Sequence, residues 1–492
     1  MGTPLSFGQE ALWFLSELAP ESRAYHLCGA ARLLKPCDAE TGEAVERAFA
    51  AMGEHHPALR TTFGEGADGN PEQRVGSGPG LAFSHDFVGS RDDLAGHLAR
   101  RLDAPFDLER GPLVRAGLIS IDTGAEGETV LWLAAHHLVA DFWSLAVMLR
   151  DVGTVYASGG GRQALMPPVD AQSEPQLSYA EWARWQRERT AGAEGERERA
   201  AWRTLLEGEL PRLELPTDRP RRAKVTWDGG AVDIRVTADA VRALGRVARG
   251  AKSNLFSALL TAFQAFLARL SGQDDLIVGT PTTGRFGARV ADQVGYFVNP
   301  VPVRADLSGD PTFLDLLLRQ RPTIQAALAL QAYPFSRLAE EIQPEHEPGR
   351  SPIFDAVLAY EKARGGEGFW GFALGVAGAR VDLGGLALES LRVEPAGSPF
   401  DLSLAVSEVS GGLAGSLRYA SELFDRATVE RWAEGLVRLI EGAAAEPLRR
   451  LSDLPLLSAA ERAALIAAGD SGPSASAEVA EDCIRLDSGF DA

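Results

Sequence analysis

Two adjacent histidines and a nearby aspartate are the residues of this chain whose types and spacing could do chemistry. His136 and His137 lie in the sequence AAHHLVADFWS, and Asp141 follows after three apolar residues. Histidine can take up or release a proton near neutral pH because its unperturbed pKa is about 6.5. Two histidines at the end of a strand can equally be packed core residues, and the aspartate a helix cap. The motif alone leaves both interpretations open.

The elements around this motif must position its side chains. The apolar residues before His136 predict a strand, and the pattern after Asp141 predicts a helix that this aspartate caps. Side chains alternate along a strand, so one histidine can face a cleft while the other packs inside the protein. The chain has no GxSxG motif and no metal-ligand spacing. The pattern therefore favours a histidine that acts as general base or orienting group, with no bound metal.

Helical and strand patterns alternate along the whole chain, which predicts an α/β fold. Residues 157–176 are rich in glycine and proline and predict a linker. The order of predicted elements after this linker is similar to the order before it. We therefore predict a first subdomain at residues 1–170, a second at 171–468, and a linker or disordered tail at 469–492.

Composition limits the classes of function. The chain has 492 residues and a formal net charge of -19, which argues against binding to nucleic acid or to anionic membranes. Its three cysteines are sparse and form no CxxC pair, as is typical of a reducing compartment. The start of the chain lacks the pattern of a signal peptide, and the most apolar predicted helix, residues 255–270, is interrupted by polar residues. We expect a cytoplasmic protein without a membrane span.

Around the histidine pair, the sequence resembles the condensation domains of nonribosomal peptide synthetases, whose signature is HHxxxDG. The resemblance extends from about Pro4 to about Ala468 and rests on a series of motifs in the family's order. These motifs are LSFGQEALWFL, EHHPALRTTF, LSYAEWARWQ, LELPTDRPR, GTPTTGR, VGYFVNPVPVR, AYPFSRLAEEI, RSPIFDAVLAY and SPFDLSLAV.

The resemblance implies two chloramphenicol-acetyltransferase-like subdomains set in a V, with a tunnel between them. It also implies an enzyme that joins a carrier-bound acyl or peptidyl thioester to the amine of a carrier-bound aminoacyl group. No cofactor is bound intrinsically, because carrier proteins deliver both substrates on phosphopantetheine arms. The implied partners are an upstream donor carrier, a downstream acceptor carrier and a neighbouring adenylation domain.

The resemblance also implies roles for individual residues. His137 is the catalytic residue, as general base or as a group that orients the amine, and His136 is structural. Asp141 is expected to pair with Arg285 and hold the shape of the loop. The candidate tunnel residues are Phe142, Ser144, Arg60, Tyr296 and Asn299. Two of them have equally simple structural interpretations, Arg60 as part of an ion pair and Asn299 as a turn residue.

One position departs from the family pattern, because Phe142 stands where the signature has glycine. A phenylalanine fits there only if the backbone is ordinary helix and the ring has space. It either lines a pocket for an unusual donor, such as a polyketide or fatty acyl chain, or obstructs the tunnel. The second case would make the chain a docking domain for carriers with weak or no activity. The heterocyclising, epimerising and recruitment-type relatives fit less well, because the histidine pair is intact and the motifs of the first two are absent.

Overall fold

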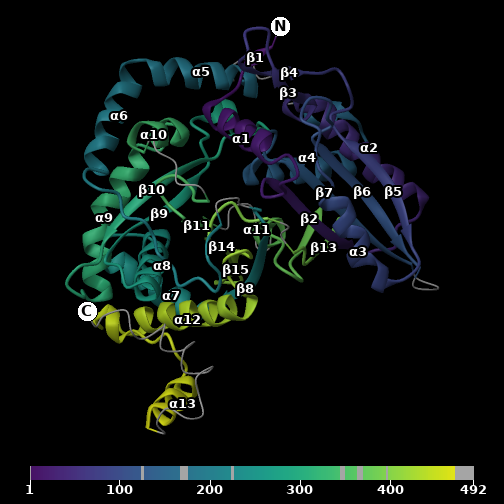
Figure 1. Ribbon diagram of the computed structural model, residues 1–492. Coiled ribbons are helices and arrows are strands. Elements are labelled where there is room, and N and C mark those ends of the chain that lie inside the picture. Colours follow the sequence, from purple (N-terminus) through teal and green to yellow (C-terminus); the bar gives the residue numbers. More distant parts are fainter. Residues whose placement is uncertain are drawn as a thin grey trace.

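Two six-stranded sheets, each packed against helices, form the two halves of the molecule (Figure 1). The computed structural model describes residues 2–122, 127–166, 176–222, 226–343, 349–362, 369–394 and 397–470. The arrangement confirms the predicted α/β class with two sheets. The predicted tail lies outside the described residues, except that residues 469 and 470 end helix α13 (Ala459–Asp470).

The first sheet has the strand order β12-β13-β2-β7-β6-β5. Its strands are β2 (His26–Leu33), β5 (Ala82–Val88), β6 (Val114–Ile121), β7 (Glu128–His136), β12 (Arg380–Leu383) and β13 (Leu386–Leu391). Helices α2 (Ala39–His55) and α4 (Phe142–Ser158) cover one face, and α3 (Arg91–Leu102) covers the other. Because side chains alternate along β7, Leu131 packs into the core between the sheet and helices α2 and α4, and Trp132 packs into the core on the opposite face, beneath α3.

The second sheet has the strand order β10-β9-β11-β14-β15-β8. Its strands are β8 (Gly229–Val236), β9 (Asp275–Thr282), β10 (Asn299–Asp306), β11 (Ala356–Glu361), β14 (Leu402–Val409) and β15 (Gly412–Ala420). Its covering helices are α7 (Ala238–Gly250), α8 (Leu255–Ser271), α9 (Phe313–Ala329) and α12 (Arg426–Ala445).

Helix α8 lies at the centre of the second half. Asn254 caps its start by accepting a hydrogen bond from the Ser257 backbone N–H at 2.9 Å, and Gly272 ends it with a φ of 73°. Every residue from Ser257 to Leu270 is buried. The predicted core helix is therefore confirmed. Among the described residues, no helix has both the length and the apolar character needed to cross a membrane.

The remaining elements lie around the two sheets. A three-stranded sheet contains β1 (Thr3–Pro4), β4 (Pro71–Val75) and β3 (Thr61–Glu65). Helix α1 (Phe7–Leu18) lies between the two halves, beside α10 (Phe335–Ile342), and begins with a capping box formed by Ser6 and Gln9 (Figure 1). Helices α5 (Tyr179–Ala191) and α6 (Ala193–Leu205) follow the predicted linker, and α11 (Phe369–Ala373) precedes β12.

Two strands cross from the second half of the sequence into the first sheet. Strand β13 pairs with β2 in antiparallel register, with Leu388 opposite Leu33 and Glu389 opposite Arg32. The guanidinium of Arg32 also pairs with the Glu389 carboxylate at 2.5 Å. Residues 380–391 therefore complete the first sheet although they follow the predicted boundary at residue 170. The division of the chain into subdomains stays a prediction.

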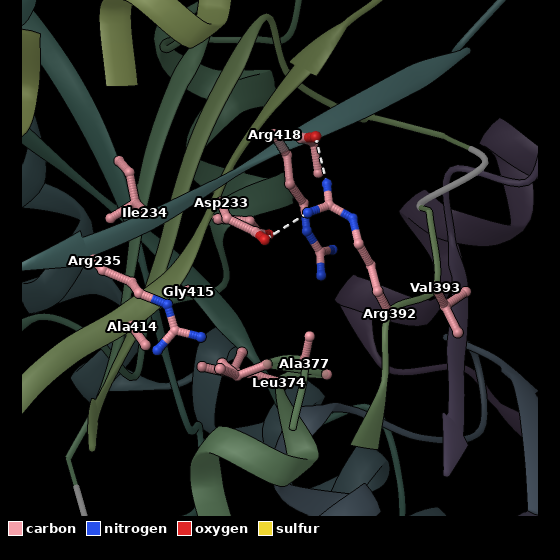
Figure 2. A pocket seen from close by; sticks show the side chains of 14 residues that line it. Asp233, Ile234, Arg235, Leu374, Ala377, Arg392, Val393, Ala414, Gly415 and Arg418 are labelled. Atoms are coloured by element: carbon pink, nitrogen blue, oxygen red, sulfur yellow. Dashed lines mark hydrogen bonds and ion pairs between the residues drawn. The ribbon is translucent and has the colours of Figure 1, made fainter. Parts of the chain in front are cut away.

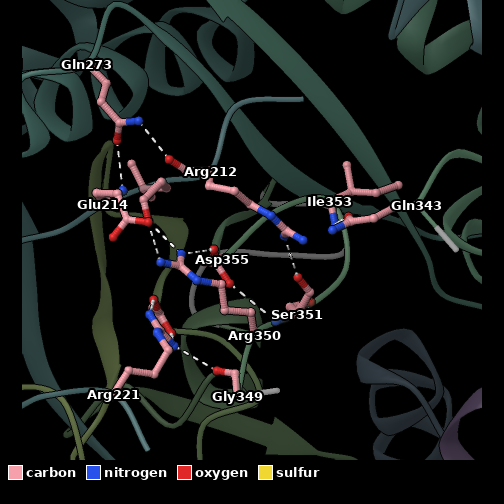
Figure 3. Close-up of polar contacts among 12 residues, drawn as sticks. Arg212, Glu214, Arg221, Gln273, Gln343, Gly349, Arg350, Ser351, Ile353 and Asp355 are labelled. Carbon is pink, nitrogen blue, oxygen red and sulfur yellow. Dashed lines mark hydrogen bonds and ion pairs between the residues drawn. The ribbon is translucent and has the colours of Figure 1, made fainter. Parts of the chain in front are cut away.

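A buried polar network holds the RSPIFDAVLAY segment in place (Figure 3). Arg350 Nη1 donates to Asp355 Oδ2 and to the Leu213 carbonyl, both at 2.9 Å, and Arg221 Nη1 donates to the Gly349 carbonyl at 2.8 Å. Burial, together with the nearby Asp401, raises the pKa of Asp355 to about 6. This motif therefore joins the start of β11 to the extended segment before β8.

Candidate functional site

The histidine motif forms a turn between a strand and a helix, as the sequence predicts. Strand β7 ends at His136, and Asp141 is the N-cap of α4. The Leu113 carbonyl accepts from the His136 backbone N–H, and the Tyr25 carbonyl accepts from that of His137, both at 2.9 Å. Backbone hydrogen bonds therefore hold both histidines in place, in addition to the contacts of their side chains.

The ring of His137 is held in one tautomer. Its Nδ1 lies 2.8 Å from the Ala140 carbonyl, which can only accept, so Nδ1 carries the proton and donates it there. Nε2 consequently keeps a lone pair. Desolvation lowers the pKa of His137, and the Asp141 charge partly opposes this shift. The ring therefore stays neutral to a lower pH than an ordinary histidine does. The side chain is partly exposed, and the ring of Tyr296 lies edge-on with a centroid distance of 5.0 Å.

The neighbouring ring of His136 faces the interior. It is 5% exposed, its Nδ1 accepts a hydrogen bond from the Leu138 backbone N–H at 3.2 Å, and it packs edge-on against His26 and Phe106. Desolvation lowers the pKa of His136 to about 3. These contacts give His136 a packing role with a neutral ring.

We expect His136→Asn to weaken the acid sensitivity of the fold. The unfolded chain protonates this histidine near pH 6.5, whereas the folded chain does so only near pH 3, so stability is lost as pH falls between these values. At about pH 5 the loss amounts to about 2 kcal/mol. Asparagine keeps an acceptor for the Leu138 N–H and cannot titrate. Urea unfolding of both proteins at about pH 7.5 and about pH 5 measures the difference. If the free energy of unfolding falls by the same amount in both proteins between these pH values, the prediction is wrong.

Asp141 is saturated by hydrogen-bond donors. It is 2% exposed, and its Oδ1 accepts from the Ser144 backbone N–H, the Ser144 hydroxyl and Arg285 Nη2, at 2.7, 2.7 and 2.8 Å. Its Oδ2 accepts from the Phe297 backbone N–H at 3.0 Å. The expected ion pair between Asp141 and Arg285 is therefore present. Four donors around one carboxylate fix the motif to the second half of the chain.

Arg285 supplies this connection from the turn after β9. Its side chain is 4% exposed, and Nη1 donates to the Val290 and Gln293 carbonyls at 3.1 and 2.7 Å. The guanidinium lies over the Phe297 ring, 4.1 Å from the centroid. Gly284 before it has a φ of 61°, and a Cβ there would lie 1.8 Å from the Phe297 carbonyl oxygen. The glycine of GTPTTGR therefore lets the two backbones approach closely.

The structure differs from the sequence prediction at Ser144. The sequence offers it as a hydroxyl that lines the tunnel, but its side chain is 0% exposed. Its oxygen contacts Asp141 and Arg285 and also accepts from the Gly295 backbone N–H at 3.0 Å. Because every direction around the hydroxyl is occupied by protein, Ser144 belongs to the link between Asp141 and Arg285.

The other candidate tunnel residues each make contacts of their own. Asn299 donates to the Gln331 and Tyr333 carbonyls and accepts from the Phe335 N–H, so it fixes the turn between α9 and α10. Arg60 donates to the Gly76 carbonyl beside β4 and makes no ion pair among the described residues. Of the five candidates, Tyr296 contacts His137 directly.

Phe142 occupies the first turn of α4 with ordinary helical backbone. Its ring packs against Trp370 of α11 with a centroid distance of 5.6 Å, and Trp143 contacts the same indole at 5.5 Å. Trp143 Nε1 also donates to the Ala291 carbonyl at 3.1 Å. The two aromatics that follow Asp141 therefore pack the start of α4 against the segment that leads into β12.

Three potential metal ligands meet at a place that the sequence spacing does not reveal. His55, His56 and Asp151 bring ligand atoms within 4.8 Å of one another. His56 Nε2 lies 2.8 Å from Asp151 Oδ2, and Arg150 Nε donates to the other carboxylate oxygen at 2.9 Å. The structure thus already gives this carboxylate two partners, and the contact with His56, the residue that caps α2, ties α2 to α4. Spacing gives no signal for the group because 95 residues separate His56 from Asp151.

Comparison with known proteins places these features in a family. The pattern of the condensation domain family matches residues 2–466. A linear gramicidin synthase protein of Brevibacillus parabrevis is 36% identical over 478 residues, which are 93% of this chain and 6% of that protein. Surfactin synthase subunit 1 of Bacillus subtilis is 30% identical over 465 residues, 94% of this chain and 12% of that protein. The chain therefore spans only a small part of these relatives.

Solved structures agree with the sequence comparison. The X-domain from teicoplanin biosynthesis is 28% identical with a TM-score of 0.77, covering 93% of this chain and 98% of that one. A four-domain nonribosomal peptide synthetase bound to AMP and glycine has the same fold at 22% identity, with a TM-score of 0.79 over 94% of this chain and 34% of that one. The two sheets and their helices match these chloramphenicol-acetyltransferase-like structures. The chain belongs to the condensation domain family of nonribosomal peptide synthetases.

Proposed function

We propose that this domain forms an amide bond between a carrier-bound acyl or peptidyl thioester and the amine of a carrier-bound aminoacyl group. The observation that carries the proposal is the lone pair on His137 Nε2, which the hydrogen bond from Nδ1 to the Ala140 carbonyl fixes in place. The amine nitrogen attacks the thioester carbonyl, a C–N bond forms and the C–S bond breaks. The amine loses a proton and the departing thiolate gains one; in the general-base form of the reaction, His137 Nε2 carries that proton from one to the other.

His137 contributes to this reaction in one of two ways. General base assistance is worth about 10²–10⁴-fold in rate. Holding two tethered reactants in line can lower a barrier by about 7–11 kcal/mol, so orientation has the greater effect on the rate when it applies. Asp141 and Arg285 act on neither reactant: they position the loop that carries His137.

The test uses two purified carrier proteins, one loaded with an acyl thioester and the other with an aminoacyl thioester. Incubation with the domain should transfer the acyl group to the second carrier as an amide, which mass spectrometry of the intact carrier detects. Carriers without the domain measure the spontaneous reaction. If a panel of acyl and aminoacyl pairs gives no product above this background, the proposal fails.

A second candidate is a domain that docks proteins without chemistry. It is supported by the likeness to the teicoplanin X-domain, which was also solved in complex with OxyB. This candidate predicts that carrier proteins bind the chain but that no amide forms. Binding measured alongside product formation separates the two functions, because only the enzyme gives product that depends on His137.

We expect the phenylalanine at position 142 to be compatible with catalysis. The Phe142 ring packs on Trp370 and its backbone is regular helix, so the loop that carries the histidines accommodates the phenylalanine without distortion. Phe142→Gly should lower the free energy of unfolding by roughly 1–3 kcal/mol, through lost packing and a glycine in the helix. The wild-type domain should form amide at least as fast as the variant. Product from Phe142→Gly but none from wild type would show that the ring obstructs the substrate path.

A further inference from the structure

An open pocket lies against the second sheet and is lined by residues of both halves of the fold (Figure 2). Strands β8 and β15 form one wall, and the segments that flank β12 and β13 form the other. Opposite residues of an antiparallel pair share a face, so Arg418 lies on the same face as Ala231, and Arg235 on the same face as Ala414. The alternate residues Ile234 and Val236 point into the core of the second half.

The charged residues of this pocket leave positive charge uncompensated. Its charged lining consists of Asp233, Arg235, Arg392 and Arg418. Arg392 is fully engaged, because it pairs with Asp233 at 2.6 Å and with Glu394 at 2.8 Å. Among the described residues, Arg235 and Arg418 make neither a hydrogen bond nor an ion pair with a carboxylate. Two guanidinium groups therefore face the pocket without a partner, in a chain whose net charge is -19.

Arg418, like Arg235, is exposed, and it lies close to Cys28 of the first sheet. Solvent reaches its side chain, yet the surrounding protein desolvates it and lowers its pKa, opposed only by Cys28. A guanidinium in such a place stays charged and gains from an anionic partner, since charge–charge attraction strengthens as water is excluded. Gly375, Gly415 and Ser416 line the pocket beside it, and their small side chains leave room for a ligand.

We infer that this pocket recognises a carboxylate on a carrier-delivered substrate, with Arg418 as its main contact and Arg235 as the second. The planar guanidinium donates two parallel hydrogen bonds to a carboxylate, which selects an acidic group over its neutral amide. The inference rests on the proposed function, because it names the class of substrate that the condensation reaction would accept.

The experiment measures binding to the full chain without any turnover. S-glutaryl-pantetheine is the acidic probe, and its terminal amide is the neutral probe of the same shape. At low ionic strength, wild type should bind the acid about tenfold more tightly than the amide. Arg418→Gln should reduce that ratio to about one, and Arg418→Lys should retain part of it. Arg246→Gln, which removes an exposed arginine from α7, should leave the ratio unchanged.

Each other outcome counts against the inference. Equal binding of acid and amide by wild type overturns it, as does an acid preference that survives Arg418→Gln. A third probe, the phosphopantetheine thioester of the amide, tests whether the site reads the phosphate of the arm. If Arg418→Gln weakens only this third probe, the carboxylate assignment is wrong. Because no product is measured, a domain that fails to form amides can still pass or fail this test.

Discussion

His137→Ala should lower the rate of amide formation by about 10²–10⁴-fold and leave the fold intact. The alanine removes Nε2 and the hydrogen bond to the Ala140 carbonyl, and the loss of one such bond costs about 1 kcal/mol of stability. His137→Gln refines the result, because its amide oxygen can accept a hydrogen bond from the amine but cannot take the proton. Single-turnover transfer between loaded carriers measures all three rates.

The pattern of these rates separates the two roles of His137. If His137 is a general base, the glutamine variant is as slow as the alanine variant; if it orients the amine, glutamine restores much of the rate. The lowered pKa of His137 adds a second readout. The ratio of wild-type to glutamine rates should fall less between about pH 8 and about pH 6.5 than a histidine with an unperturbed pKa would give, because the neutral ring persists to lower pH and the amine titrates equally in both reactions. Unchanged product formation in His137→Ala would remove His137 from the chemistry.

Arg285→Met should destabilise the protein by about 3–5 kcal/mol, the cost of leaving one partner of a buried ion pair unpaired. Both side chains are almost fully buried, at 4% exposure for Arg285 and 2% for Asp141. The variant keeps the Ser144 and Phe297 donors of Asp141 but removes the only cation that contacts its carboxylate among the described residues. Urea unfolding at neutral pH measures the loss, and activity should fall with it because the loop loses its anchor.

A matched surface pair gives the control for this prediction. Arg242 and Asp239 lie three residues apart on α7 and are 59% and 90% exposed. Arg242→Met should change stability by at most about 1 kcal/mol, because solvent screens exposed pairs. The double variant Asp141→Asn with Arg285→Met should recover part of the stability, since it leaves no buried charge unpaired. If Arg285→Met were as mild as Arg242→Met, the pair would not hold the loop.

Local patterns in the sequence predict the elements that carry the site. The apolar strand before His136 and the capping aspartate after it specify β7, the turn and the start of α4 through interactions only a few residues apart. Helix α8 follows from its Asn254 cap and its mostly apolar sequence. The pairing of Asp141 with Arg285 spans 144 residues, and the sequence predicted it only through resemblance to the family.

Long-range contacts explain the parts that the sequence did not predict. Ser144 looks like an ordinary residue in the first turn of a helix, and its burial depends on Gly295, 151 residues away. The cluster of His55, His56 and Asp151 arises where α2 packs on α4, which no local spacing records. The alternation of β8 shows which of its residues share a face, but only the fold shows that Arg235 and Arg418 face the same pocket.

The crossing of β12 and β13 into the first sheet sets the order in which the chain can fold during synthesis. Strand β2 ends at Leu33, but its partner β13 is synthesised only when the ribosome reaches residue 391. Until then the β2 edge has no neighbour on that side, and an unpaired edge is a site of aggregation. Such a contact slows folding because a long loop must close first. The first half therefore reaches its final form only after most of the second half has left the ribosome.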